Sequence, residues 1–419
     1  MAANIQLQSA AVDPLLRGLV DTSVVKVPFV KPPIGVVCAP FTHTRASFGL
    51  NTALPANCSL PFNSYLSVPQ YCLISNSFLK VTVTVPANTQ PMQYAPIFMF
   101  DSIDLLNADG RSFWQARPES TFVYVNQCME ADLKLAAKNL ILAAETDCAD
   151  AATAGTFTAL IPLVHLPWNN LDSHTAAWDL RAFAPQLRLY IRWRAASEWM
   201  FTTSSAGVVG NTVISDCQLV TDLYDLSNAA PVAASYVPRM QITRAWEYQT
   251  FDMPAEASGV TSATYTFALT ALSQPSALFF AYIIAYDLAD GSRTTPLPWD
   301  AFYLSASGSK LIDPPLTAQE GALEQARLFP CGPFGGFDYS TLPNIISWSF
   351  SLPGYATGHD SDACGAFSFR KSVNPSMTVT QSGSALQSHR TCVVVSSTVS
   401  TLRYMGTYGV QKVEIGDAL

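Results

Sequence analysis

One short stretch of the sequence carries the residue types of an acyl-transfer enzyme. Ser307-Gly308-Ser309-Lys310 fits the S-x-x-K pattern, in which the serine is the nucleophile. That chemistry requires the serine to open a helix, so that the lysine lies one turn away. Here Gly308 interrupts two strand-like runs and favours a hairpin turn, and a similar turn occurs at Asp109-Gly110. The pattern therefore predicts paired strands rather than a nucleophile.

A second stretch has the donor atoms of a metal site. Four candidate ligands lie in "TGHDSDACG": His359, Asp360, Asp362 and Cys364. Ca²⁺ is the ion that such an oxygen-rich set would suit, but alternating aspartates without a completed ligand pattern are typical of a solvated loop. His165 and His174 each lack a second ligand nearby. We therefore assign no catalytic, cofactor-binding or metal-binding residue, and we expect no cofactor.

The sequence has no other motif of an enzyme active site. It lacks a G-x-S-x-G elbow, a phosphate-binding P-loop and a G-x-G-x-x-G fingerprint, and nothing selects a catalytic pair among its 31 acidic residues. Its eight tryptophans are spread over both halves, which favours anchors of cores and interfaces over stacking of nucleic-acid bases. We expect a protein without enzymatic activity.

The composition favours a chain with large interfaces. Charged residues make up 13% of the 419 residues, against about 25% in typical soluble domains, while apolar residues reach 49%. The two longest uncharged stretches, 47–79 and 257–286, are interrupted by prolines, and we expect neither to span a membrane and see no secretory signal. A net charge of −8 disfavours direct binding of nucleic acid. We therefore expect a soluble protein much of whose surface is covered by partners.

The nine cysteines predict a reducing compartment. Their number is odd and no C-x-x-C pair occurs, so buried free thiols are favoured over a disulfide framework or a zinc site.

Short β-like runs dominate the chain and predict β-sandwiches. They alternate with period two and are separated by Pro, Gly, Asn and Ser. The predicted strands include 78–85, 160–167, 187–193, 216–226, 263–272, 277–286, 345–352, 376–382 and 392–399. Only Gln127–Glu145 and Ala318–Leu328 have helical spacing, and Thr317 with Glu320 forms a capping box before the second helix.

These elements recur in the same order in two halves of the chain. Gly110 of the first hairpin lies 198 residues before Gly308 of the second, and each hairpin is followed by a predicted helix. A strand ending at Leu-Pro then follows in each half, at Leu166-Pro167 and Leu352-Pro353, with an offset of 186. A closing pair of strands ends each half. We interpret the chain as an N-terminal arm (1–35), a first sandwich (36–226), a linker (227–238) and a second sandwich (239–419).

Two sandwiches in tandem, each with a helix after an equivalent hairpin, resemble the double jelly-roll major capsid proteins of the tectivirus, adenovirus, virophage and large DNA virus lineage. Near the C-terminus, Gly365 precedes Ser368-Phe369-Arg370-Lys371, and Ser400-Thr401-Leu402-Arg403-Tyr404-Met405-Gly406 leads to Gly409-Val410. The Leu-Arg-x-Met-Gly core is similar to that of the virophage and large-virus branch. The asparagines of that branch's motifs are missing, and its glycine cluster is shorter here.

The resemblance implies a fold and a role. The fold would be all-β, with two eight-stranded jelly rolls and short helical insertions. The role would be that of a virion capsid protein, assembled inside the host cell, whose homotrimers form pseudo-hexameric capsomers that tile an icosahedral shell. Its partners would be neighbouring capsomers and minor capsid proteins, with the arm (1–35) as candidate contact to an internal membrane or, alternatively, a disordered tail.

Two other functions remain open from the sequence. One is a carbohydrate-binding or carbohydrate-active β-sandwich protein, and the other is a minor capsid or vertex protein of a virion.

Overall fold

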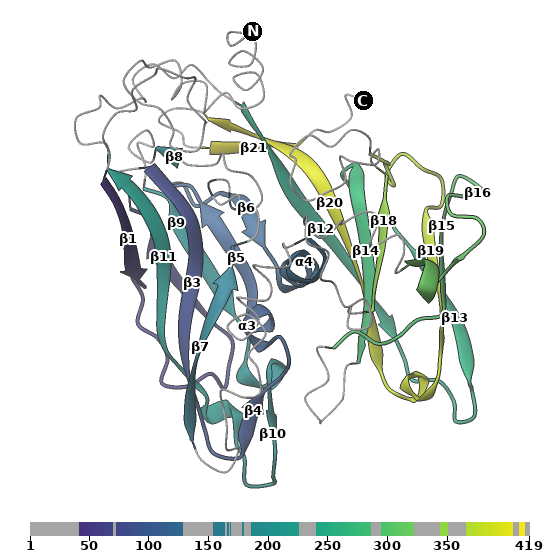
Figure 1. Ribbon diagram of the computed structural model, residues 1–419, viewed down its shortest axis with the longest axis horizontal. Coiled ribbons are helices and arrows are strands. Elements are labelled where there is room, and N and C mark those ends of the chain that lie inside the picture. Colours follow the sequence, from purple (N-terminus) through teal and green to yellow (C-terminus); the bar gives the residue numbers. More distant parts are fainter. Residues whose placement is uncertain are drawn as a thin grey trace, which may run out of the picture.

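The structure is a computed structural model dominated by antiparallel β-sheets. It describes residues 42–69, 73–128, 154–163, 166, 168, 178–179, 186–225, 240–285, 295–321, 344–350, 366–404 and 410–414. Figure 1 shows two sandwiches side by side, with the helix α4 (Pro118–Val123) between them.

The first sandwich contains two main sheets and a short ribbon. One sheet runs in the order β1-β11-β3-β7, with β8 paired to β3, and the other runs β2-β9-β5-β6. The strands of the first sheet are β1 (Thr42–Gly49), β11 (Val213–Asp225), β3 (Leu73–Val85), β7 (Gly155–Pro162) and β8 (Trp178–Asp179). The strands of the second are β2 (Phe62–Ser67), β9 (Arg188–Trp193), β5 (Phe100–Leu106) and β6 (Ser112–Ala116). The ribbon pairs β4 (Thr89–Pro91) with β10 (Met200–Thr202), next to the helix α3 (Ala95–Phe98).

The second sandwich has the same plan. Its sheets run β12-β20-β14-β18, with β21 paired to β20, and β13-β19-β15-β16, with β17 paired to β15. The strands of the first sheet are β12 (Met240–Met253), β20 (Arg390–Tyr404), β14 (Ser276–Ala285), β18 (Ile345–Ser349) and β21 (Val410–Glu414). The strands of the second are β13 (Ser262–Ala268), β19 (Ser376–Ser382), β15 (Ala301–Ala306), β16 (Ser309–Lys310) and β17 (Leu316–Thr317).

The two halves share one jelly-roll topology. When the eight main strands of each half are counted in chain order, both halves form sheets in the orders 1-8-3-6 and 2-7-4-5. These are two eight-stranded jelly rolls, as the sequence predicted. The predicted division into arm, sandwiches and linker at 35, 226 and 238 stays a prediction, because residues 1–41 and 226–239 lie outside the described ranges.

The two hairpins occupy the same place in the two sandwiches but close differently. In β15–β16, Ser305 pairs with Lys310 and Ala306 with Ser309, so that Ser307 (φ 52°) and Gly308 (φ 77°) alone form the turn. In β5–β6 the turn is longer, because the Asn107 amide donates to the Arg111 carbonyl and only Gly110 has a positive φ, 83°. The sequence match between the hairpins therefore marks equivalent strands but not equivalent turns.

The predicted strands are found, with shifted ends in some cases. The strand predicted at 160–167 is β7, which begins earlier, at Gly155, and ends at Pro162. Proline has no amide hydrogen for the ladder, and the chain then turns, with the Leu166 amide donating to the Leu163 carbonyl. Of its counterpart at 345–352, β18 covers Ile345–Ser349.

The predicted helices lie mostly outside the described residues. The structure describes only the start of the 127–145 segment, where a π-helical turn (Tyr124–Cys128) continues α4. For the second helix it describes residues 318–321, which are helical. The predicted capping box is present there, since the Thr317 hydroxyl and amide donate to the Glu320 carboxylate, and the Glu320 amide donates back to the hydroxyl.

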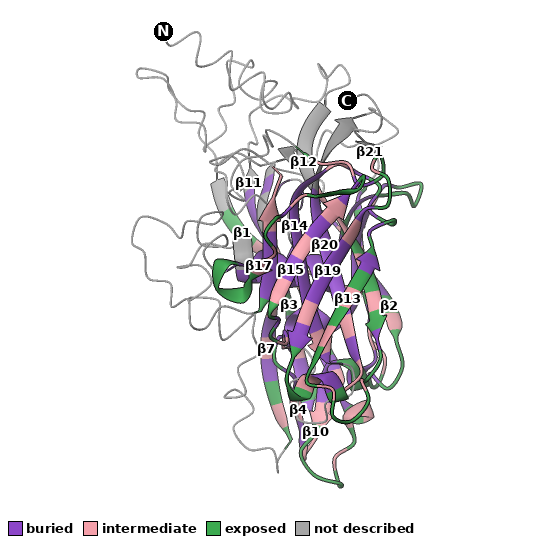
Figure 2. Ribbon diagram, turned by 90° about the vertical axis from the view of Figure 1, so that its right-hand side faces the viewer, coloured by how far each residue is buried: buried purple, intermediate pink, exposed green. Residues whose placement is uncertain are grey.

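Each sandwich buries its own core, and tryptophans anchor the first one. The indole nitrogens of Trp193 and Trp168 donate to the hydroxyls of Ser64 and Ser77, each over 2.8 Å, inside the first sandwich. Such buried indoles combine a large apolar area with one satisfied donor. In the second sandwich, β14 is buried along almost its full length. Strand β13, at the edge of its sheet, alternates between exposed and half-buried residues (Figure 2).

A buried arginine holds the second sandwich together at the start of β20. Arg390 is completely buried, and its guanidinium donates to Gln381 Oε1 (2.5 Å), the Tyr265 hydroxyl (2.8 Å) and the backbone carbonyl of Pro254 (3.2 Å). The Tyr265 hydroxyl in turn donates to a carboxylate oxygen of Glu256, 2.7 Å away. The charge is thus solvated by neutral oxygens that converge from three segments of the chain.

Replacing this arginine by an apolar residue of similar length should destabilise the second sandwich. Arg390→Met removes the donors and leaves Gln381 and Tyr265 without their partner, so we expect the free energy of unfolding to fall by about 3 kcal/mol or more. Denaturant titration measures this change. The matched control is Arg188→Met on the exposed face of β9, with an expected change of about 0.5 kcal/mol or less. Equal effects of the two substitutions would contradict the structural role of Arg390.

Candidate functional site

The residues that imitate an acyl-transfer motif form a surface hairpin. Ser309 and Lys310 are exposed, and the Lys310 ammonium lies 5.3 Å from the centre of the Tyr303 ring and 3.5 Å from an Asp313 carboxylate oxygen. Ser307 is tied to a neighbouring loop, since its amide donates to the Val373 carbonyl over 2.7 Å. The hairpin prediction is therefore correct, and no helix at 307–310 places the lysine next to the serine as S-x-x-K chemistry requires.

The other candidate ligands cannot be placed. Residues 351–365, with His359 to Cys364, lie outside the described residues, as do His165 and His174. Among the residues that are described, no group of three or more His, Cys, Asp or Glu side chains could hold a metal ion. Within the same part of the chain, no helix has the length and apolarity that crossing a bilayer requires.

The three cysteines whose surroundings are described are buried free thiols. Cys58 and Cys217 lie in the first core and Cys392 in the second. Burial raises the pKa of each thiol above its usual value, so all three stay protonated and unreactive at neutral pH. For these residues the expectation of buried free thiols is confirmed.

A distinctive interaction surface is the seam between the two sandwiches, formed where α4 meets the sheet β12-β20-β14-β18. Side chains on one face of β14, such as Phe279, Ala281 and Ile283, lie in the core of the second sandwich. The alternate side chains Phe280 and Tyr282 belong instead to the core of the first sandwich. This sheet is therefore buried on both faces, and one continuous apolar cluster crosses from one sandwich to the other.

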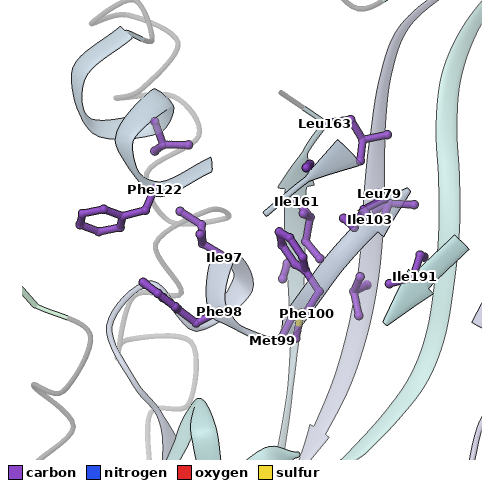
Figure 3. Packing of buried hydrophobic residues seen from close by; sticks show 14 of the residues in the cluster. Leu79, Ile97, Phe98, Met99, Phe100, Ile103, Phe122, Ile161, Leu163 and Ile191 are labelled. Carbon is purple, nitrogen blue, oxygen red and sulfur yellow. The ribbon is translucent and has the colours of Figure 1, made fainter. Parts of the chain in front are cut away.

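Helix α4 contributes the central aromatic side chain of the seam. The ring of Phe122 lies 5.0 Å from the ring of Tyr282 on β14, and its centroid is 4.8 Å from that of Tyr94 and 5.8 Å from that of Phe98. Figure 3 shows Phe122 beside Ile97 and Phe98 of α3, which connect it to the interior of the first sandwich. Helix α4 thus packs on the second sandwich, and α3 supports it from the first.

Helix α4 is not among the elements predicted from the sequence, although its start carries a recognisable signal. Pro118 is at the first helical position, Glu119 lies in the first turn, and Ser120 exchanges hydrogen bonds with the backbone of Arg117. These are preferences of helix N-termini. Because the helix has only six residues, it is too short to show apolar periodicity.

Charged side chains border the apolar centre of the seam. The Arg194 guanidinium lies 3.5 Å from the Glu119 carboxylate, 3.7 Å from that of Asp101 and 3.8 Å from that of Glu198. Arg117 also approaches Asp101, at 3.6 Å. These residues all come from the first sandwich, and Glu119 lies in the first turn of α4.

Two polar contacts reach across the seam. The guanidinium of Arg117 lies over the ring of Tyr248 on β12, 5.1 Å from its centre, and the Thr295 hydroxyl donates to Gln93 Oε1 over 2.7 Å. The strand β21 of the second half also lies against β6 of the first. The sandwiches are therefore joined by apolar packing with polar contacts around it.

Two buried acidic groups meet at the centre. Glu119 is 9% exposed, and neither its Oε2 atom nor the Tyr282 hydroxyl has a hydrogen-bond partner among the described residues. Burial raises the pKa of Glu119, and the nearby Arg194 and Arg117 only partly oppose this effect. Burial also raises the pKa of Tyr282 well above its usual value, and the negative charge of Glu119 adds to the shift. Burial thus disfavours the charged form of both groups.

The C-terminal segments that carry the capsid-protein resemblance have structural roles. Phe369 is buried and packs against Phe279, Phe350 and Phe367 in the second core. Residues 402–404 end β20 and pair with β21, while 405–409 lie outside the described residues. The described parts of these motifs are therefore elements of the fold.

Comparison with known proteins identifies the fold. No protein-family model matches the chain, and no curated protein sequence matches it. Among solved structures, the PBCV-1 virus capsid is similar, with a TM-score of 0.69 and 11% identity over 92% of this chain and 100% of that chain. The Faustovirus major capsid protein gives 0.61 and 11% over 96% and 98%, and the Sputnik virophage structure 0.58 and 12% over 94% and 93%. The chain therefore has the double jelly-roll fold.

Removing the aromatic ring at the centre of the seam should weaken the whole molecule. For Phe122→Ala we expect the free energy of unfolding to fall by about 3–5 kcal/mol, because a fully buried ring leaves a cavity between α4 and β14. Denaturant titration followed by tryptophan fluorescence measures the change. The control is Leu60→Ala at a side chain that is 73% exposed, where stability should hardly change. A near-neutral Phe122→Ala variant would show that the seam contributes little.

The raised pKa of Glu119 predicts a specific pH dependence. A carboxyl group whose pKa is higher in the folded than in the unfolded chain stabilises the fold below its usual pKa, and loses that contribution as the pH rises through the raised value. We expect Glu119→Gln to match the wild type in acid and to be the more stable protein at pH 7 to 8. Melting temperatures of the two proteins, measured from acid pH to pH 8, test the prediction. As a control, Glu198→Gln removes a half-exposed carboxylate near the same Arg194 and should keep the pH trend of the wild type. A Glu119→Gln variant that is less stable than the wild type at pH 8 would contradict the prediction.

Proposed function

We propose that this protein is a viral major capsid protein, structural and without catalytic activity. The observation that carries the proposal is the double jelly-roll fold, in which both sandwiches have the same strand order. This fold matches the PBCV-1, Faustovirus and Sputnik capsid structures over nearly their whole length. The low fraction of charged residues, 13%, agrees with a chain whose surface is covered in an assembly.

The proposed assembly is a homotrimer. Three copies of a chain with two equivalent sandwiches place six similar units around one axis, which gives a pseudo-hexagonal capsomer that can tile an icosahedral facet. The seam supports this arrangement because it holds the two sandwiches of one chain as a single body. Neighbouring capsomers and minor capsid proteins would then be the partners, and the virion the location.

The N-terminal arm (1–35) is proposed as a base contact of the capsomer, to neighbouring capsomers or to an internal membrane. No contact with nucleic acid is part of the proposal, since the net charge of −8 disfavours neutralisation of phosphates.

The assembly can be tested on the purified full-length chain. Light scattering after gel filtration should give a mass three times the 45.3 kDa of the chain, and negative-stain electron microscopy should show particles with a hexagonal outline. At higher concentration these particles should form sheets or shells. A stable monomer that binds or cleaves a glycan would overturn the proposal in favour of a carbohydrate-active β-sandwich protein.

A further inference from the structure

Among the described residues, the outward face of one sheet of the first sandwich is open at β3, whereas the equivalent sheet of the second sandwich is covered by the seam. The seam covers the outward face of β12-β20-β14-β18, and the equivalent sheet of the first sandwich is β1-β11-β3-β7. On β3 of this sheet, Leu79, Val81 and Val83 face the core, while Lys80 is exposed and Thr82 half-exposed. The Lys80 side chain is thus open to solvent, and that of Thr82 is partly open.

The ladder of strand pairs gives the residue correspondence between the two faces. The pairing of β3 with β7 ends at Phe78 and Pro162, and that of β14 with β18 ends at Leu278 and Ser349. When the two strands are aligned at this end of the ladder, each residue of β3 corresponds to the residue of β14 whose number is 200 higher. Lys80 therefore corresponds to Phe280 and Thr82 to Tyr282. In this alignment, the residues of β3 that face the first core correspond to residues of β14 that face the second core, because side chains alternate along a strand.

The helices that follow the hairpins have the same offset. α4 begins after Arg117, whose backbone exchanges hydrogen bonds with Ser120, and the second helix begins after Thr317, which forms a capping box with Glu320. Glu119, which lies close to Tyr282 in the seam, therefore corresponds to Gln319. Residues 317–320 are all exposed, in contrast to the buried first turn of α4.

We propose that the turn 317–320 of one copy packs on the outward face of β3 in a second copy, at Lys80 and Thr82, and so repeats between chains the contact that α4 makes within the chain. The proposal rests on the proposed trimer and names its contact surfaces. One chain cannot make this contact with itself, because β3 lies in the first sandwich, and β15, with which Thr317 pairs, lies on the far side of the second (Figure 1). Only another copy can bring the two surfaces together.

The chemistry of the two surfaces is complementary and polar. The face of β3 offers the Lys80 ammonium and the Thr82 hydroxyl where β14 has two aromatic rings, and the turn offers the Gln319 amide and the Glu320 carboxylate where α4 has Glu119 and Ser120. A polar surface tolerates water before assembly, whereas the apolar face of β14 has to be covered as the chain folds. The same geometry thus serves a permanent contact within the chain and a separable contact between chains.

Site-directed cross-linking tests this contact. In the full-length chain carrying Thr82→Cys and Gln319→Cys, a short bis-maleimide should produce covalent dimers and trimers on a denaturing gel. Each single variant and the unsubstituted chain should stay at the background level. The matched control pair is Asn63→Cys with Gln319→Cys, in which Asn63 is exposed on β2, in the other sheet of the first sandwich; it should also give background.

Gel filtration with light scattering of the same samples separates two failures. If the variants are trimers and the Thr82–Gln319 pair does not cross-link above the control pair, this inference is wrong while the trimer stands. If the unsubstituted chain is a monomer at every concentration, both the trimer and the contact are wrong.

Discussion

The molecule depends on the burial of one sheet on both of its faces. Phe279 and Ala281 of β14 fill the core of the second sandwich, and Phe280 and Tyr282 between them fill that of the first. An antiparallel sheet usually keeps one face in water, so a strand without polar alternation must be covered twice. At about 25 cal/mol per Å² of apolar surface, leaving this second face in water would cost several kcal/mol, and this cost makes the two sandwiches one body.

The seam also places charge beside that apolar surface. Arg194 holds three carboxylates within 4 Å of its guanidinium, yet one oxygen of Glu119 and the hydroxyl of Tyr282 stay without a partner among the described residues. An unsatisfied buried polar atom costs about 1–3 kcal/mol, so the packing around Phe122 must offset it. The seam is therefore stabilised mainly by shape and apolar area, and its polar groups make it sensitive to pH.

The two copies of the domain show which features the jelly-roll topology requires and which features depend on what each surface contacts. Both halves keep the strand orders 1-8-3-6 and 2-7-4-5, although the equivalent hairpins turn differently and the equivalent sheet faces carry opposite chemistry. Both copies also keep the pattern of inward apolar residues that each core requires. The outward residues are free to differ, as Thr82 and Tyr282 do, because the seam covers Tyr282 while Thr82 lies on a partly open face.

The sequence by itself determined the all-β class, the tandem duplication and the character of the hairpins, because period-two alternation and the Gly110 and Gly308 turns are local signals. It also indicated the capping box at Thr317. Only the tertiary structure decided where strands end, that the short helix α4 exists, and that Phe122 meets Tyr282 more than 150 residues away. The continuous apolar run of β14 is equally compatible with a strand buried inside one sandwich and with a strand covered by two different sandwiches. The partner on its second face comes from a distant loop, which no local pattern can specify.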